Sequence, residues 1–117
     1  MVIKKVDDCI FCKIINGEIP ADIVYEDQDV MAFKDIRPVA PNHLLFIPKK
    51  HIPTLSDLTK EDGHLMANLS LADANVAQKK GLESYRIVCN CNEDAGQTVF
   101  HIHFHLLAGR KFQWPPG

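Results

Sequence analysis

Three histidines at alternate positions near the end of the chain carry the strongest chemical signal in the sequence. They are His101, His103 and His105, in the stretch His-Ile-His-Phe-His-Leu-Leu. Successive side chains of a β-strand point to opposite faces, so a strand here would line one face with imidazoles and the other with apolar residues. We therefore predict a strand that presents a row of imidazoles beside the core.

Such a row of imidazoles has three interpretations. The rings could be buried and satisfied by hydrogen bonds, they could bind a catalytic metal, or one ring could attack an electrophile such as phosphorus. Three buried imidazoles without a function would leave many nitrogen atoms to satisfy, which disfavours the first interpretation. Imidazole suits the third because its ordinary pKa of about 6.5 leaves most of it neutral and nucleophilic at neutral pH. The residues alone leave the second and third open.

A cysteine pair near the other end of the chain bears on this choice. Cys9 and Cys12 form a Cys-x-x-Cys motif. Two thiolates at this spacing make half of a tetrahedral zinc site, and two histidines would close it without an open position, which is typical of structural zinc. A redox pair is the rival interpretation, but it expects a strand leading directly into the motif, and only eight largely polar residues precede this one.

Length and charge indicate the kind of protein that holds these residues. We expect one domain that covers residues 1–117. The formal net charge is −2, with acidic and basic residues mixed along the chain, which gives no footprint for nucleic acid or an anionic membrane. No apolar run approaches the roughly 18 residues of a membrane span. We expect a cytoplasmic protein with neither a nucleic-acid nor a membrane partner.

Apolar periodicity and turn residues indicate the elements that must position the site. A short helix is expected over residues 9–16, with Asp8 as its N-cap. A long helix is expected to open at Ser56 or Thr59. Strands are predicted at residues 22–25, 30–34, 43–48 and 85–90 and at the histidine stretch. The run at 43–48 is almost wholly apolar, which favours a central strand covered on both faces.

Two polar loops could complete a site around the histidines. Asp35 opens a proline-containing loop, and its spacing alone favours a solvated turn residue over an acceptor for a vicinal diol such as a ribose. The loop at 89–98 leads into the histidine stretch, so a hairpin would place its backbone N–H groups, an amide and a hydroxyl beside the imidazoles. We expect that an anion could be held there.

Several stretches together match a known family. They are the histidine stretch, Cys-Ile-Phe-Cys-Lys-Ile-Ile at 9–15, Pro-Lys-Lys-His at 48–51, Gly-Gln-Thr-Val-Phe at 96–100 and the terminal Trp-Pro-Pro-Gly. The chain thereby resembles the histidine triad superfamily, whose motif is His-φ-His-φ-His-φ-φ with φ an apolar residue. Its tail is more similar to the Hint branch, the purine nucleoside phosphoramidases, than to the Fhit or uridylyltransferase branches.

The resemblance implies a fold and an assembly. The fold would be α+β, with a five-stranded antiparallel sheet, one long helix and one short helix. Two copies would form a homodimer with a continuous ten-stranded sheet.

The resemblance also implies an activity. His103 would attack the α-phosphorus of a purine nucleoside 5′-phosphoramidate and form a covalent nucleotidyl-histidine, which water then hydrolyses to nucleoside monophosphate. Three alternatives stay open: a nucleotide-binding adaptor with incidental hydrolysis, a dinucleoside polyphosphate hydrolase of the same superfamily, and a metal-dependent hydrolase.

Residue roles follow from the same resemblance. The residues that would assist the nucleophile are His105 and Thr98, and those that would contact the phosphate are Asn90, Gly96 and Gln97. Asp35 would accept the ribose hydroxyls, and the purine pocket would be formed by Ile10, Phe11, Ile14, Phe33 and Ile36. One structural Zn²⁺ per chain, without a catalytic role, would be held by Cys9, Cys12, His51 and His101. No organic cofactor is implied.

Overall fold

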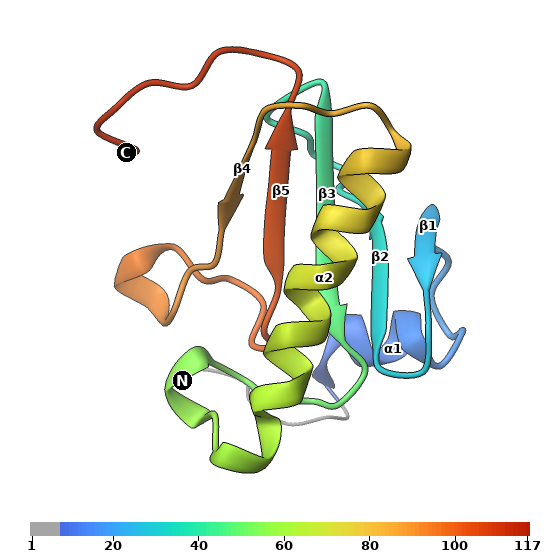
Figure 1. Ribbon diagram of the computed structural model, residues 1–117. Helices are drawn as coiled ribbons and strands as arrows, with labels where there is room; N and C mark the ends of the chain where they lie inside the picture. The colour runs from blue at the N-terminus through green and yellow to red at the C-terminus, as the bar shows by residue number, and fades with distance from the viewer. Residues whose placement is uncertain (1–7) are drawn as a thin grey trace.

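An antiparallel sheet with a helix on each side forms the protein (Figure 1). The computed structural model describes residues 8–117. The strands are β1 (Ile23–Glu26), β2 (Val30–Lys34), β3 (Asn42–Pro48), β4 (Tyr85–Val88) and β5 (Phe104–Ala108), in the spatial order β1-β2-β3-β5-β4. The helices are α1 (Ile10–Ile15) and α2 (Gly63–Lys79). The predicted α+β fold is therefore confirmed.

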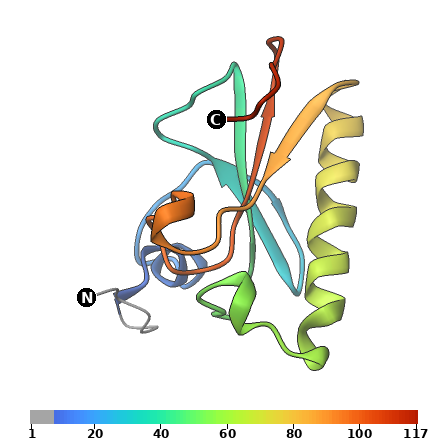
Figure 2. The same cartoon turned by 90° about the vertical axis from the view of Figure 1, so that its left-hand side faces the viewer.

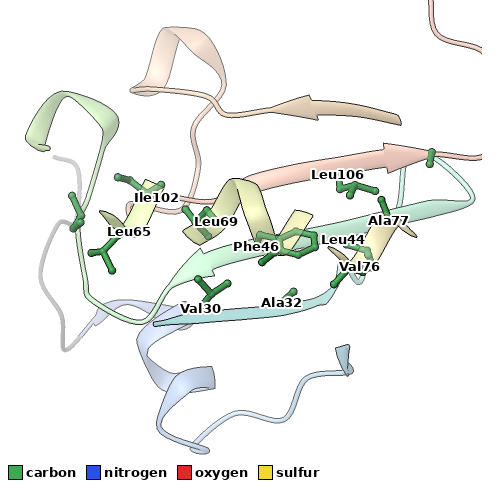
Figure 3. Packing of buried hydrophobic residues seen from close by; sticks show 13 residues of the cluster. Val30, Ala32, Leu44, Phe46, Leu65, Leu69, Val76, Ala77, Ile102 and Leu106 are labelled. Atoms are coloured by element: carbon green, nitrogen blue, oxygen red, sulfur yellow. The ribbon is translucent and has the colours of Figure 1, made fainter. Parts of the chain in front are cut away.

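Both faces of the central strands are covered, which explains their continuous apolar sequence. In Figure 2, α2 lies on one side of the sheet, and α1 lies on the other. On the α2 side, Phe46 and its neighbours pack against Leu69 and other apolar residues of the helix (Figure 3). On the α1 side, Leu45 and Phe33 pack with Phe11. Because successive side chains of β2 and β3 point to opposite faces, the apolar residues of each strand contribute to both hydrophobic clusters, one on each side of the sheet.

Helix boundaries differ from the prediction because short polar side chains cap earlier turns. Cys9, and not Asp8, is the N-cap of α1, and its Sγ accepts a hydrogen bond from Cys12 N at 3.3 Å. The long helix begins only at Gly63, after the 3-10 turns η2 (Leu55–Asp57) and η3 (Lys60–Asp62), each closed by a capping box. Two successive boxes satisfy the N–H groups of two separate turns, so one continuous helix does not form.

No helix of the described residues is long and apolar enough to cross a membrane.

The prediction that one strand carries all three triad histidines is wrong. β5 begins at Phe104, which pairs with Phe46, so a longer ladder would set His103 against Ile47 and then Ile102 against Pro48. Proline has no N–H to continue the ladder. Ile102 N instead donates to Ile52 O at 2.8 Å. The chain therefore leaves the ladder before His103, although the three rings still lie on the α1 side of the sheet.

Candidate functional site

A cavity of about 270 Å³ opens between α1 and the sheet. Its walls include all five apolar side chains that the resemblance assigns to the purine pocket: Ile10, Phe11, Ile14, Phe33 and Ile36. Its polar lining residues are Lys34, Asp35, Thr98, His103 and His105. An apolar cavity with a few convergent polar groups has the form of a small-molecule site. Because this cavity brings together residues from both ends of the chain, it is the candidate functional site.

Phe11 connects the short helix to the histidines. Its ring centroid lies 5.1 Å from that of His103 and 5.9 Å from that of His101, both in edge-to-face arrangements. It also meets Phe33 of β2 at 5.5 Å. Edge-to-face packing restricts the orientation of both partners. The α1 helix thus forms one wall of the cavity and holds the first two triad rings in place.

His103 is arranged as a nucleophile. Its Nδ1 lies 2.8 Å from the carbonyl oxygen of His101, and since a carbonyl only accepts, Nδ1 carries the proton and donates. Burial lowers the pKa of His103, so the ring is neutral at neutral pH and its lone pair is on Nε2. The side chain is 7% exposed and lines the cavity. An imidazole ring with its lone pair on Nε2 therefore lines the space in which a ligand would lie.

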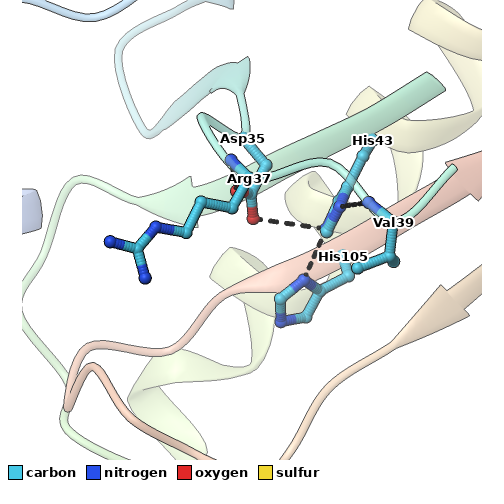
Figure 4. A network of polar contacts seen from close by, with 5 residues as sticks. All are labelled: Asp35, Arg37, Val39, His43 and His105. Carbon is cyan, nitrogen blue, oxygen red and sulfur yellow. Dashed lines mark hydrogen bonds and ion pairs between the residues drawn. The ribbon is translucent and has the colours of Figure 1, made fainter. Parts of the chain in front are cut away.

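A fourth histidine, which sequence reasoning placed only within an apolar strand, lies beside His105. His43 Nε2 is 2.9 Å from His105 Nδ1 and 3.3 Å from Asp35 Oδ2 (Figure 4). Burial lowers the pKa of His43, and the Asp35 carboxylate opposes this shift. The signal in the sequence was an ionisable residue in an otherwise apolar strand, because a buried histidine needs a hydrogen-bond partner.

The loop before the triad is held by its own side chains. Gln97 is 4% exposed, and its amide nitrogen donates to Pro53 O at 2.8 Å and Val99 O at 3.0 Å, while its amide oxygen accepts from Asn92 N at 2.7 Å. The Gln97 amide therefore shapes the loop from behind. Of the predicted phosphate-side residues, Thr98 lines the cavity, whereas three others are not among its lining residues: Asn90, Gly96 and Gln97.

Gly96 has a conformational reason for its identity. Its φ is 103°, in the left-handed region that favours glycine, and it ends the 3-10 turn η4 (Glu93–Ala95). A Cβ at this position would lie 3.5 Å from Asn90 Nδ2, which is ordinary contact. Backbone geometry, rather than crowding, therefore requires glycine where the loop turns toward Thr98.

The four residues predicted to bind a metal lie together. Cys9, Cys12, His51 and His101 have ligand atoms within 4.8 Å of one another. The sulfur–nitrogen separations are 3.3, 3.3 and 3.6 Å, and the Nδ1 atoms of the two histidines are 3.2 Å apart. Ideal tetrahedral zinc with bonds of about 2.3 Å to sulfur and 2.0–2.1 Å to nitrogen would require about 3.5 Å and 3.3 Å. The cluster could therefore hold a metal ion.

Hydrogen bonding and burial support this donor set. His101 Nε2 lies 2.7 Å from Pro48 O, so Nε2 carries the proton and the lone pair of Nδ1 faces the cysteines. Metal-bound histidines commonly donate their other N–H in this way. Burial, together with the neighbouring Cys9, raises the pKa of the Cys12 thiol to about 12. A divalent cation bound here would compensate the negative charge of the buried Cys12 thiolate and so favour its deprotonation.

Comparisons with known proteins identify the family. The sequence model described as "Scavenger mRNA decapping enzyme C-term binding" matches residues 8–113. A HIT-like protein of Synechocystis is 53% identical over 112 residues, covering 95% of this chain and 98% of the relative. A HIT family hydrolase of Legionella pneumophila is 54% identical, with a TM-score of 0.92 over 94% of this chain and 100% of the other. A histidine triad protein of Clostridium difficile is 43% identical, with a TM-score of 0.88 over 95% and 97% of the two chains. The chain therefore belongs to the HIT, or histidine triad, family and has the fold of its hydrolases.

Proposed function

We propose that the protein hydrolyses purine nucleoside 5′-phosphoramidates, as a Hint-type phosphoramidase, through a covalent nucleotidyl-histidine. The observation that carries the proposal is the position of His103, which lines an apolar cavity and donates from Nδ1 to a carbonyl, so that its lone pair is on Nε2. The base would lie between α1 and β2, where the walls are apolar. The ribose would lie at Asp35, and the phosphate would lie between Thr98 and the histidines.

The reaction proceeds in two displacements. His103 Nε2 forms a bond to the α-phosphorus, the P–N bond breaks, and the leaving nitrogen takes up one proton from solvent. A water molecule then attacks the phosphorus, the bond to His103 breaks, and the proton from water returns to solvent. The net reaction consumes one water and releases nucleoside monophosphate and amine. Burial supports the first step because it lowers the pKa of His103 and keeps the nucleophile neutral.

Donors around the phosphate support the transition state. Thr98 and His105 line the same cavity as His103, and the hydroxyl of Thr98 and the ring of His105 are the donors that we assign to the phosphate. The centroids of the His103 and His105 rings are 4.9 Å apart. Hydrogen-bond donors that are already in position before the reaction stabilise the charge that develops in the transition state, because the protein does not have to reorganise. Removal of one such donor typically lowers kcat by a factor of about 10²–10³.

Zinc would have a structural role in this proposal. Cys9, Cys12, His51 and His101 would hold the ion, and all four protein ligands would leave it no open position for substrate. Its contribution would be to order the segment that carries His103, whose Nδ1 is held by the backbone carbonyl of His101.

Trapping the adduct tests the proposal. The purified protein is mixed with adenosine 5′-monophosphoramidate, quenched in milliseconds to seconds, and analysed by mass spectrometry. We expect a transient adenylyl group on His103 in the wild type. In His103→Ala we expect no adduct and a loss of turnover of at least about 10³-fold. His64→Ala, on the exposed side of α2, is the matched control and should react as the wild type does. Tight nucleotide binding without an adduct would instead support the adaptor.

A second candidate function is favoured by the similarity of residues 8–113 to the scavenger mRNA decapping enzymes. A decapping-type hydrolase cleaves a phosphoanhydride rather than a P–N bond, and the same nucleophile could serve both reactions. The two candidates differ in the leaving group, so kcat/KM for the phosphoramidate is compared with kcat/KM for a dinucleoside polyphosphate. A higher value for the dinucleotide would replace the first assignment with the second.

A further inference from the structure

Asp35, His43 and His105 form a connected chain of polar contacts (Figure 4), and the two ends of the chain, Asp35 and His105, line the cavity. The chain begins at the backbone, where Val39 N donates to His43 Nδ1 at 3.1 Å. His43 Nε2 then faces two acceptors, His105 Nδ1 at 2.9 Å and Asp35 Oδ2 at 3.3 Å. The other carboxylate oxygen of Asp35 accepts from Arg37 N at 2.7 Å, which orients the carboxylate.

The backbone contact determines where the protons lie. Because Val39 N–H can only donate, His43 Nδ1 is unprotonated, and a neutral His43 must carry its proton on Nε2. That proton is donated mainly to His105 Nδ1, the closer acceptor. His105 Nδ1 is therefore an acceptor, and a neutral His105 must carry its proton on Nε2. One backbone N–H thus sets the tautomer of two histidines in turn.

A metal site is the rival interpretation of these three residues, because their ligand atoms lie within 4.8 Å of one another. The Val39 contact argues against it. A metal bound to His43 Nε2 would replace the proton there, while Nδ1 still accepts from the backbone, so the ring would have to become an imidazolate. His101 shows the opposite pattern, since its second nitrogen donates to a carbonyl. The three residues therefore form a hydrogen-bond chain rather than a metal centre.

We propose that His43 is a positioning residue that links ribose recognition at Asp35 to the donor that His105 presents to the phosphate. The inference rests on the proposed function and deepens it. His43 holds His105 as a neutral ring with Nε2–H available to the substrate, so His105 acts as a hydrogen-bond donor and not as an imidazolium acid.

The link to ribose follows from the shared proton. In the free protein, Asp35 Oδ2 and His105 Nδ1 both attract the proton of His43 Nε2. When ribose hydroxyls donate to Asp35, that carboxylate attracts the proton less, and the contact to His105 strengthens. Ribose hydroxyls therefore raise kcat as well as lowering KM. One hydrogen bond is worth about 0.5–1.5 kcal/mol, so their effect on kcat is expected to be about twofold to twelvefold.

Two variants separate this role from a merely structural one. In His43→Asn, the shorter amide can still accept from Val39 N but does not reach His105. In His43→Gln, the longer amide can place an N–H near the position of Nε2. Each variant and the wild type are assayed with adenosine 5′-phosphoramidate and with its 2′,3′-dideoxy analogue, and kcat and KM are measured separately. His64→Gln is the matched control on the exposed side of α2.

We expect the dideoxy analogue to lower kcat in the wild type, in His64→Gln and in His43→Gln, and to leave kcat unchanged in His43→Asn. An equal loss of kcat in His43→Asn and in the wild type would overturn the proposal. A second measurement does not depend on turnover or on the folding of a variant: ¹H–¹⁵N NMR of the wild-type histidine side chains should show His105 protonated on Nε2 alone. Protonation on Nδ1 would overturn the inference. An inactive wild type with the expected tautomer would refute only the phosphoramidase assignment.

Discussion

At the scale of single residues, the backbone partner of one ring nitrogen determines what the other nitrogen of each imidazole can do. His103 and His101 both donate one N–H to a backbone carbonyl, which leaves a lone pair on the other nitrogen, where we propose a bond to phosphorus in His103 and to a metal in His101. His43 instead accepts from a backbone N–H, so its free nitrogen is a donor. Rings of the same type within one site therefore take different roles because the backbone presents them with different partners.

Cys9 allows the metal assignment to be tested without disturbing the helix. Serine is among the best N-cap residues, so Cys9→Ser keeps a side-chain acceptor for the N-terminus of α1 while removing a thiolate ligand. We expect the wild type to contain about one zinc per chain and the variant to lose it, with a fall in Tm of about 10 °C or more. Elemental analysis and calorimetry measure the two effects. Cys91→Ser, outside the metal cluster, should change neither, and full zinc content in Cys9→Ser would contradict the assignment.

At the scale of elements, α2 carries an ionisable group on its buried side. Asp73 is 4% exposed, and among the described residues its Oδ1 has no hydrogen-bond partner. Burial raises the pKa of its carboxyl to about 7. A carboxyl whose pKa is higher in the folded than in the unfolded protein binds more protons when folded. The stability of the fold therefore decreases as pH rises from about 4, where the unfolded chain ionises, to about 7.

Replacing this carboxyl should stabilise the protein at high pH. Relative to the wild type, Asp73→Ala is expected to raise the free energy of unfolding at pH 8 by roughly 3–4 kcal/mol, and by much less at pH 4. Urea denaturation at the two pH values measures the difference. Asn75→Ala, at an exposed position of the same helix, controls for helix propensity and should have a pH-independent effect. A gain for Asp73→Ala that is equal at both pH values would show that ionisation is not involved.

The sequence was informative wherever an element depends on local pattern, and less so where distant segments meet. β2 and the apolar run of β3 were predicted because alternation and turn residues are local signals. The start of β5 at Phe104 was not, because it depends on the contact of Ile102 N with Ile52 O and on the position of Pro48 in the neighbouring strand. His43 was missed for the same reason: its partners are His105, which is 62 positions away, and the backbone of Val39, and no local pattern identifies that chain.

At the scale of the whole molecule, one edge of the sheet has the features of an assembly surface. β4 is an edge strand, and its Tyr85 and Ile87 are each 38% exposed. The C-terminal tail extends past this strand (Figure 1) and is held by Arg86, whose guanidinium lies 5.2 Å from the ring centroid of Phe112. Trp114 beyond it is 82% exposed. An uncovered edge strand with apolar side chains favours pairing with another chain.

We therefore expect two copies to pair through β4 across a two-fold axis, extending the two sheets into one. A lysine on an edge strand opposes such pairing because its charge would be buried against the partner. Ile87→Lys should thus convert a species with the mass of two chains into one with the mass of a single chain, as measured by sedimentation velocity at micromolar concentration. Ile23→Lys makes the matched change on β1, the other edge of the sheet, where the side chain is 45% exposed, and should leave the mass unchanged. If Ile23→Lys dissociated the pair and Ile87→Lys did not, the copies would meet through β1 instead. The C-terminal tail would then lie away from the interface, and Trp114 would have no partner surface to cover.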